Sequence, residues 1–207
     1  MITELLTRYP VLRACEEDIL RALKTLTDLY ENGDKLLLCG NGGSASDCDH
    51  IVGELCKGFL SRRALPEKQK AKMKDESPTL SDETLSKLQQ GLPAISLPSI
   101  APLNAAFAND VDADLIYAQS VLALGKRGDC LLAISTSGNS KNVIEACRVA
   151  RALGLSVIAL TGEGGGQLRA LADVRICVPE RETYRVQELH LPVYHALCAS
   201  IERHFWG

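Results

Sequence analysis

Short apolar runs alternate along this chain with stretches in which apolar residues recur at every third or fourth position. The short runs, bounded by Gly, Pro or Asp, predict buried strands, and the spaced patterns predict amphipathic helices. The predicted strands are Lys35–Gly40, Gly91–Leu97, Cys130–Ile134, Ser156–Leu160 and Val174–Val178. Because these strands are short, apolar and separated by helices, we expect a doubly wound, five-stranded parallel α/β sheet.

Long helices are expected at both ends of the chain. Helical spacing runs from about Ile2 to Asn32, with a break or bend at Pro10, because proline lacks the backbone donor that a helix interior uses. The last helix begins near Thr183, reaches the C-terminus and should be kinked at Pro192 for the same reason. Shorter helices are expected over residues 44–59, 101–109, 112–124, 142–153 and 167–172.

Residues 61–90 interrupt this alternation. The segment is dense in Lys, Arg, Glu and Ser, contains Pro66 and Pro78, and has few apolar residues. A solvated excursion of one or two short helices, one starting at Ser81 and closed by Gly91, is the favoured interpretation because charge runs are usually exposed. A lid beside a ligand site is the alternative, since long insertions often carry function. The whole chain fits one domain spanning residues 1–207, with this charged helical insertion inside it.

A glycine turn joins the first strand to the next helix in residues 36–54, LLLCGNGGSASDCDHIVGE. Backbone N–H groups and a helix N-terminus in this layout can hold an anion. The helix, capped by Ser44 or Ser46, carries His50 and Glu54 on one face. The turn also matches the dinucleotide pattern GxGxx(G/A), but no acidic residue ends the next strand as that pattern requires. We therefore expect no nucleotide cofactor.

A second polar loop, Ser135-Thr136-Ser137-Gly138-Asn139-Ser140, follows the third strand and precedes a helix. Its hydroxyls and the helix N–H groups can surround a phosphate with neutral donors. The alternative is a helix cap with incidental serines, although a cap needs only one such side chain. The last helix contains Gln187, His190, His195 and His204. Any one of them is more often an ordinary residue than a catalyst, and we keep that interpretation for His204. For His190, three residues after Gln187, both interpretations stay open and the structural one is favoured.

Length, charge and cysteine spacing exclude several classes. The 207 residues suit one domain, and the net charge of -3 gives no support for a nucleic-acid partner. No apolar run approaches the roughly 20 residues of a membrane span, and the N-terminus lacks a signal-peptide core. The eight cysteines are scattered without a CxxC, mostly inside apolar runs. This pattern favours buried reduced thiols and a cytoplasmic location.

Four segments occur together in a characteristic order: GNGGSASDCDH…GEL, ISTSGNSKNVIEA, LTGEGGG…LADVRICVP and QELHLPVYHALCASIE. They resemble the sugar isomerase (SIS) domain, and specifically its phosphoheptose isomerase branch, over almost the whole chain except residues 61–90. The resemblance implies interconversion of sedoheptulose 7-phosphate and D-glycero-D-manno-heptose 7-phosphate through an enediol. It also implies that Glu54 and His195 move a proton between C1 and C2. A carboxylate and an imidazole suit that task because burial and neighbours bring their pKa values near neutrality.

The same resemblance implies the remaining site residues. The phosphosugar would be held by Asn41, Gly42, Gly43, Ser44, Asp110, Ser135, Thr136, Ser137, Ser140 and Gln187. Some family members bind zinc, which makes His50, Glu54, Gln187 and His195 the candidate ligands of one ion per site. A ligating Glu54 would be a poorer base, and both readings stay open.

Helix geometry makes it difficult for all four of these ligands to reach one ion. Gln187 and His195 are eight residues apart and rise about 12 Å relative to each other on a straight helix. A kink at Pro192 or a neighbouring subunit would ease their convergence. The resemblance itself implies a homotetramer with active sites at subunit interfaces.

Two features depart from the family pattern: the long insertion, and Tyr184, where many relatives have an aspartate. They motivate a first alternative, an isomerase of another phosphosugar. A second alternative is a non-catalytic SIS protein that binds a phosphosugar or a protein partner, as replication-initiator-binding relatives do. Retention of both Glu54 and His195 argues against the second, since a pure binder needs no proton-transfer pair.

Overall fold

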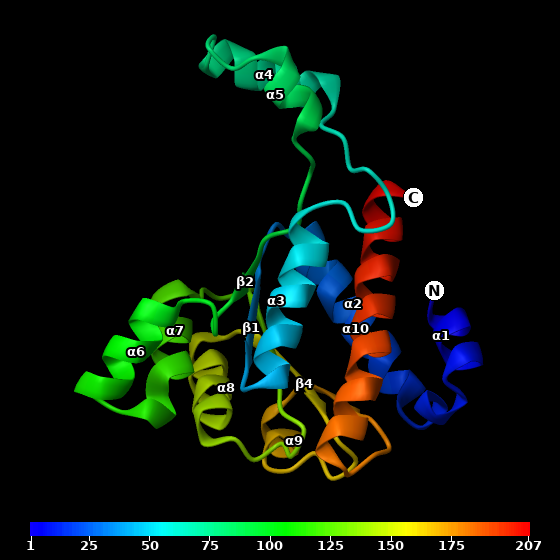
Figure 1. The fold of residues 1–207 in the computed structure, drawn as a ribbon, viewed down its shortest axis with the longest axis vertical. Coiled ribbons are helices and arrows are strands. Elements are labelled where there is room, and N and C mark those ends of the chain that lie inside the picture. Colours follow the sequence, from blue (N-terminus) through cyan, green and yellow to red (C-terminus); the bar gives the residue numbers. More distant parts are fainter.

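A computed structural model describes all residues from 1 to 207 and contains one five-stranded sheet with the strand order β2-β1-β3-β4-β5 (Figure 1). The strands are β1 (Leu36–Gly40), β2 (Ala94–Ser96), β3 (Cys130–Ile134), β4 (Ser156–Thr161) and β5 (Val174–Cys177). Every neighbouring pair is parallel. The predicted doubly wound parallel sheet is therefore confirmed. The strand order reverses between β1 and β3, which is where ligands bind in such sheets.

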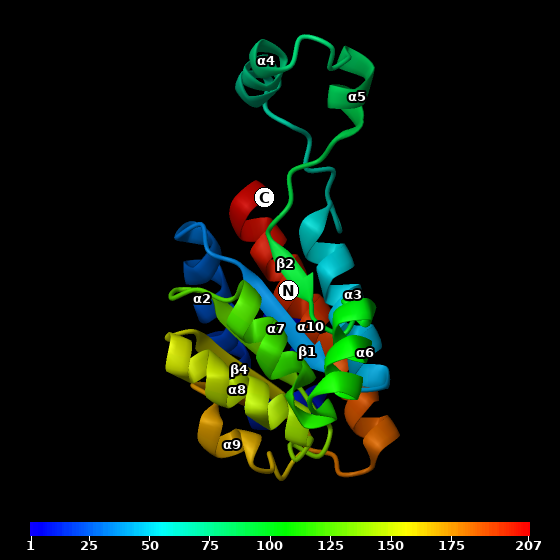
Figure 2. The ribbon, with the colours of Figure 1, turned by 90° about the vertical axis from the view of Figure 1, so that its left-hand side faces the viewer.

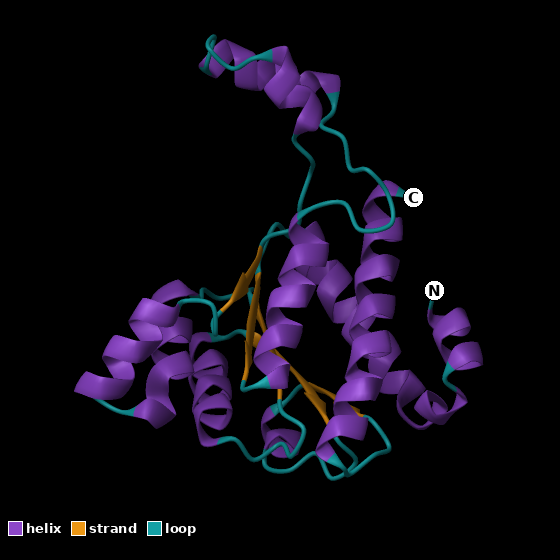
Figure 3. Cartoon of the chain, viewed as in Figure 1, coloured by secondary structure: helices purple, strands orange, loops and turns teal.

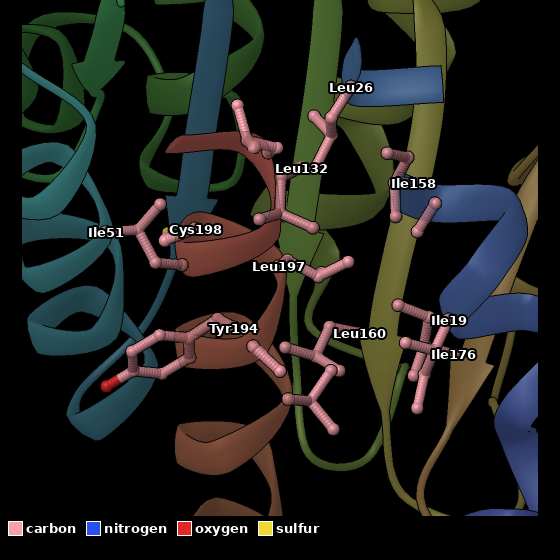
Figure 4. Close-up of a cluster of buried hydrophobic side chains, with 14 of the residues drawn as sticks. Ile19, Leu26, Ile51, Leu132, Ile158, Leu160, Ile176, Tyr194, Leu197 and Cys198 are labelled. Carbon is pink, nitrogen blue, oxygen red and sulfur yellow. The ribbon is translucent and has the colours of Figure 1, made fainter. Parts of the chain in front are cut away.

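Helices cover both faces of the sheet (Figure 3). One face carries α1 (Ile2–Arg8), η1 (Pro10–Cys15), α2 (Glu16–Glu31), α3 (Gly43–Cys56) and α10 (Thr183–Trp206), and the other carries α7 (Ile116–Leu124), α8 (Lys141–Leu153) and α9 (Leu168–Leu171). Side chains alternate along each strand, so that Leu36 and Leu38 pack in the first core while Leu37 and Cys39 pack in the second. Figure 4 shows the first core, where α2, α3 and α10 meet the strands.

The two terminal helical regions form as predicted. The leading region is interrupted at Pro10, where η1 separates α1 from α2. The last helix continues as one element through Pro192. None of the helices combines the length and the apolarity that crossing a bilayer requires. Six of the eight cysteine thiols are buried, as expected, and the exceptions are Cys56 and Cys177.

The predicted serine cap of α3 is wrong. The N-cap residue is Gly42, with φ of 54° and no side-chain capping bond, and Ser44 is buried inside the first turn. Glycine is suited to this position because a positive φ is strained for residues with a Cβ. The helix also ends earlier than expected, at Cys56. The chain therefore turns directly from β1 into α3, with the backbone N–H groups at the helix start free of side-chain partners.

The insertion forms two short helices, α4 (Glu67–Glu76) and α5 (Asp82–Lys87), as the excursion interpretation predicts. Both project from the body, at the end of the molecule opposite the start of α3 (Figures 1 and 2). Ser81 caps α5 through its hydroxyl, but Gly91 does not close that helix. A Cβ at Gly91 would instead lie 2.3 Å from the carbonyl oxygen of Cys56, so glycine is needed for close approach to α3. Within one chain this α4–α5 hairpin therefore does not cover the carboxyl end of the sheet, where the lid alternative would place it.

Candidate active site

The candidate site lies along the seam between α3 and α10, which are side by side and run in the same direction (Figure 1). At the start of the seam, a Cβ on Gly43 would lie 2.4 Å from the amide nitrogen of Gln187. Two turns further, His50 faces His195. Beyond the end of α3, Glu202 of α10 accepts backbone hydrogen bonds from residues 59–61. This parallel register joins two segments that are about 140 residues apart in the sequence.

His50, Glu54 and His195 form the centre of the seam. The Nε2 atom of His50 lies 3.4 Å from Nε2 of His195 and 3.3 Å from Oε1 of Glu54. The two imidazole rings are nearly perpendicular, with centroids 4.9 Å apart. The Glu54 side chain is 13% exposed and that of His50 is 43% exposed, so the cluster opens to solvent on the histidine side. Within one chain, His50 therefore lies next to both Glu54 and His195, as the predicted site requires.

The electrostatic setting of this cluster suits proton transfer. Burial and then the neighbouring His50 lower the pKa of His195 below its ordinary value, and Glu54 offsets this only in part. His195 is therefore a neutral imidazole at neutral pH, able to accept or pass on a proton. The Oε2 atom of Glu54 is buried and has no hydrogen-bond partner. Leaving a buried acceptor without a hydrogen bond costs about 1–3 kcal/mol of stability. A group left in this state calls for an explanation, and a hydrogen bond or proton transfer to a bound ligand would provide one.

Buried contacts at the end of α3 hold Glu54 in place. The guanidinium of Arg63 donates to the backbone carbonyls of Glu54 and Leu55, at 2.9 and 2.6 Å, and its Nε donates to Glu202 at 2.7 Å. The same guanidinium stacks on the Trp206 ring at 4.5 Å. Burial alone would raise the pKa of Glu202, but the Phe59 N–H, Arg63 and the Leu60 N–H together lower it. The base of the insertion is thereby fixed to α10.

Two residues of the site were missed by sequence reasoning. The Tyr194 hydroxyl donates to Oδ1 of Asp47 at 3.1 Å and lies 3.0 Å from Nδ1 of His50. Burial raises the pKa of Asp47 above its ordinary value. The signal available in the sequence was positional: Asp47 precedes His50 by three residues, which places both on one helix face, and Tyr194 adjoins His195.

The loop between β3 and α8 has the features expected of an anion site. The hydroxyls of Ser135 and Ser140 lie 3.1 Å apart, and the Gly138 N–H donates to Ser135 Oγ at 3.2 Å. Ser140 occupies the N-cap position of α8 but makes no capping bond, so the cap alternative does not explain these serines. Thr136 and Ser137 line a cavity of about 320 Å³ together with residues from the loops at 162–164 and 180–181.

The glycine turn and the serine loop are tied together at the point where the strand order reverses. Asn41 and Asn142, the latter in the first turn of α8, exchange two hydrogen bonds through their side-chain amides, at 2.9 and 3.0 Å. The Tyr117 hydroxyl also donates to the Gly40 carbonyl at 2.7 Å. Asn41 and residues 42–44 therefore lie near the start of α8, as a single phosphosugar site requires.

Two predicted site residues, and Tyr184 of the family departure, lie away from the cluster in one chain. Asp110 is the last residue of α6 (Ala101–Asp110), which stands at the side of the molecule away from α10, and its only side-chain hydrogen bond comes from Asn109 (Figure 1). Gln187 packs against Gly43, about two turns of α10 before His195, so the expected four-ligand set does not converge. Tyr184 is 56% exposed, and its hydroxyl accepts a hydrogen bond from Arg185.

His50, Glu54 and His195 have the donor atoms that zinc prefers. Bonds of about 2.0–2.1 Å in a tetrahedral site place neighbouring donors about 3.3–3.4 Å apart. The distances from His50 Nε2 to His195 Nε2 and to Glu54 Oε1, 3.4 and 3.3 Å, equal that spacing. No three His, Cys, Asp or Glu side chains, however, converge around one ion position as they stand. Donor type and pairwise spacing therefore fit zinc, and full enclosure would need a further donor or a small rearrangement.

Comparisons with known proteins identify the family to which the chain belongs. Residues 86–162 match the family described as the SIS domain. The chain is 37% identical over 194 residues to the phosphoheptose isomerase of Helicobacter pylori (strain P12), covering 94% of this chain and 88% of that protein. It is 41% identical over 187 residues to the phosphoheptose isomerase of Dechloromonas aromatica (strain RCB), covering 89% and 82%. The solved phosphoheptose isomerase structure from Neisseria gonorrhoeae superposes with a TM-score of 0.76 at 32% identity, covering 97% and 94%. The chain therefore belongs to the phosphoheptose isomerase family of SIS-domain proteins.

Proposed function

We propose that this protein is an aldose–ketose isomerase that converts sedoheptulose 7-phosphate to D-glycero-D-manno-heptose 7-phosphate. The observation that carries the proposal is the cluster of Glu54, His50 and His195 in the seam between α3 and α10. The relatives named phosphoheptose isomerase, which align over nearly the whole chain, support the same reaction.

The geometry supports a proton-transfer mechanism through an enediol. Glu54 removes a proton from C1 of the ketose while His195 supplies a proton to the C2 oxygen, which yields the enediol. The proton held by Glu54 then returns to C2, and His195 takes the proton of the C1 hydroxyl. The Oε2 atom of Glu54, which has no hydrogen-bond partner, suits the base, and a neutral His195 imidazole suits proton exchange with the two oxygens. General acid–base catalysis of this kind contributes roughly 10²- to 10⁴-fold.

The substrate's phosphate would occupy the loop after β3. Ser135, Thr136, Ser137 and Ser140 offer hydroxyls there, and the N–H groups at the start of α8 add a favourable dipole. Neutral donors of this kind bind a dianion without the strong salt dependence of a lysine cluster. Asn41 and the backbone of Gly42, Gly43 and Ser44 lie next to this loop and would contact the sugar hydroxyls.

Zinc, one ion per site, is part of this proposal. His50, Glu54 and His195 would hold it, with Gln187 as the fourth ligand only if a neighbouring subunit or a shift of α10 brings it close. The ion when bound would polarise the oxygens at C1 and C2 as a Lewis acid. If Oε1 of Glu54 faced the ion, Oε2 would be the atom left for proton transfer.

A homotetramer with active sites at subunit interfaces is the assembly we propose. Asp110 and Gln187 lie away from the cluster of their own chain, and α6 has no fully buried residue. An apolar groove of about 560 Å³ between α1 and α10 borders His195 and includes exposed Leu60 and Leu191. Light scattering of the purified protein tests the assembly. A cytoplasmic location, without membrane or nucleic-acid partners, completes the proposal and is supported by the buried thiols.

Turnover of sedoheptulose 7-phosphate by the purified protein, with and without added zinc, tests the reaction. For Glu54→Gln we expect turnover to fall by roughly 10²- to 10⁴-fold while the fold and phosphosugar binding persist. Glu17→Gln, an exposed glutamate on α2, is the matched control and should retain full turnover. Equal turnover in both variants would refute Glu54 as the base. Wild-type protein that binds but does not convert the heptose phosphate would direct the search to other phosphosugars or to a binding role.

A further inference from the structure

A buried phenol connects a carboxylate to the central histidine of the site. Tyr194 is 2% exposed, and in Figure 4 its ring lies in the core while its hydroxyl points toward α3. The hydroxyl donates to Oδ1 of Asp47 at 3.1 Å and lies 3.0 Å from Nδ1 of His50. The ring also contacts both site imidazoles edge-on, with centroids 5.5 Å from His50 and 5.0 Å from His195.

The chemistry of these three groups sets the direction of both hydrogen bonds. A carboxylate can only accept, so the single phenolic proton of Tyr194 goes to Asp47. The phenol oxygen is then an acceptor toward His50, and Nδ1 of the imidazole must carry the proton that fills this contact. In the neutral imidazole only one nitrogen is protonated, which leaves Nε2 with a free lone pair.

That lone pair faces the reaction site. Nε2 of His50 lies 3.3 Å from Oε1 of Glu54 and 3.4 Å from Nε2 of His195. A bare nitrogen and a carboxylate oxygen at this separation are two acceptors, which attract each other only when a cation or a proton lies between them. The arrangement therefore prepares a site for a divalent metal ion or for a substrate hydroxyl.

We propose that Tyr194 and Asp47 are positioning residues that hold His50 in the Nδ1-protonated tautomer, so that Nε2 is presented to the metal or substrate. The catalytic consequence rests on the proposed isomerase function, but the tautomer itself does not. Outer partners of this type orient a ligating imidazole, and their loss costs about 10- to 100-fold in metal affinity or activity.

The first test is the tautomer of His50 in the full-length wild-type protein without metal or substrate. Long-range ¹H–¹⁵N NMR of ¹⁵N-histidine-labelled protein, recorded above neutral pH and assigned with a His50→Gln variant, distinguishes the two nitrogens. We expect a protonated Nδ1 and a bare Nε2 for His50. The opposite tautomer in the wild type would overturn the inference, whatever the variants do.

The second test compares Tyr194→Phe with Tyr184→Phe, a control that removes an exposed phenol from the same helix. For Tyr194→Phe we expect loss of the single Nδ1–H tautomer and about 10- to 100-fold weaker Zn²⁺ binding, measured by competition with a chelating dye. The fall in kcat should exceed any change in KM, because the phosphate loop lies on other elements. Unchanged tautomer and Zn²⁺ affinity in a folded Tyr194→Phe variant would refute the role. Absence of turnover in the wild type would instead refute the proposed function, since both readouts work without substrate.

Discussion

The base of the insertion and its α4–α5 hairpin are close in the chain, yet the base forms a buried ion pair with α10 and the hairpin exposes its own. At the base, Arg63 and Glu202 of α10 are 0% and 4% exposed and lie 2.7 Å apart. In the hairpin, Lys87 and Glu83 are 70% and 76% exposed. Buried pairs of this kind are costly to break, whereas exposed pairs contribute about 0–1 kcal/mol. The number of charged residues therefore does not show whether a segment's ion pairs stabilise the fold. The burial of both members of each pair decides it.

The hairpin is also separate from the two cores. No residue of α4 is buried, and the buried Leu65 and Leu85 belong to neither core cluster. The seam, by contrast, contributes Ile51, Tyr194 and Leu197 to the first core. Apolar packing thus fixes the elements that carry the reacting residues, while the insertion is held mainly at its base by Arg63.

The largest expected effect comes from breaking the buried pair. Glu202→Gln leaves the Arg63 guanidinium buried without a countercharge, and we expect a loss of about 3–5 kcal/mol in the free energy of unfolding. Lys87→Met, which breaks the exposed pair of the hairpin, should cost less than about 1 kcal/mol. Chemical denaturation of both variants measures the difference, and similar losses would contradict the comparison.

The second largest expected effect is a pH dependence of stability that arises from a buried histidine of α10. Burial lowers the pKa of His190 in α10 to about 4, and the Thr161 backbone offsets this only slightly. Between the unfolded pKa near 6.5 and about 4, the unfolded chain binds a proton that the folded chain does not. Stability should therefore fall by about 3 kcal/mol as the pH drops through this window and level off below it.

Variants of two histidines isolate this contribution. His190→Leu should remove most of the pH slope, and His204→Leu, an exposed histidine beside Glu31, should leave it unchanged. Denaturation midpoints across the pH range provide the readout. An unchanged slope in His190→Leu would assign the pH dependence to other groups.

The smallest effect is expected from removing the hairpin. Ala64 and Gln89 pair in an antiparallel bridge, so residues 65–88 can be replaced by a two-residue Asn-Gly turn. We expect a stability change within about 1 kcal/mol and unchanged turnover, because loop length contributes weakly. Thermal melting and the isomerase assay check this. A folded variant that has lost turnover would restore the lid interpretation, with the hairpin acting on a neighbouring subunit.

Local sequence patterns predicted most of the helices and strands but were less successful at the residues where these elements begin and end. The five strands and the Ser81 cap of α5 follow from apolar runs and capping chemistry, which act over a few residues. The capping role of Ser44 and the helix-closing role of Gly91 were predicted wrongly for different reasons. The turn into α3 has a positive φ at Gly42, which places the cap there and leaves Ser44 buried against Gly40, whereas Gly91 is decided by its close approach to the end of α3, a segment distant in the sequence.

The sequence by itself determined the parallel sheet, the two polar loops at its carboxyl end, and the candidate status of His50, Glu54 and His195. Only the tertiary structure decided that α3 and α10 run side by side in a register that joins His50 to His195, leaves Gln187 at Gly43 and brings Tyr194 to Asp47. The physical reason is range. Periodicity and capping depend on neighbours within a few residues, whereas helix register depends on side-chain packing between segments about 140 residues apart.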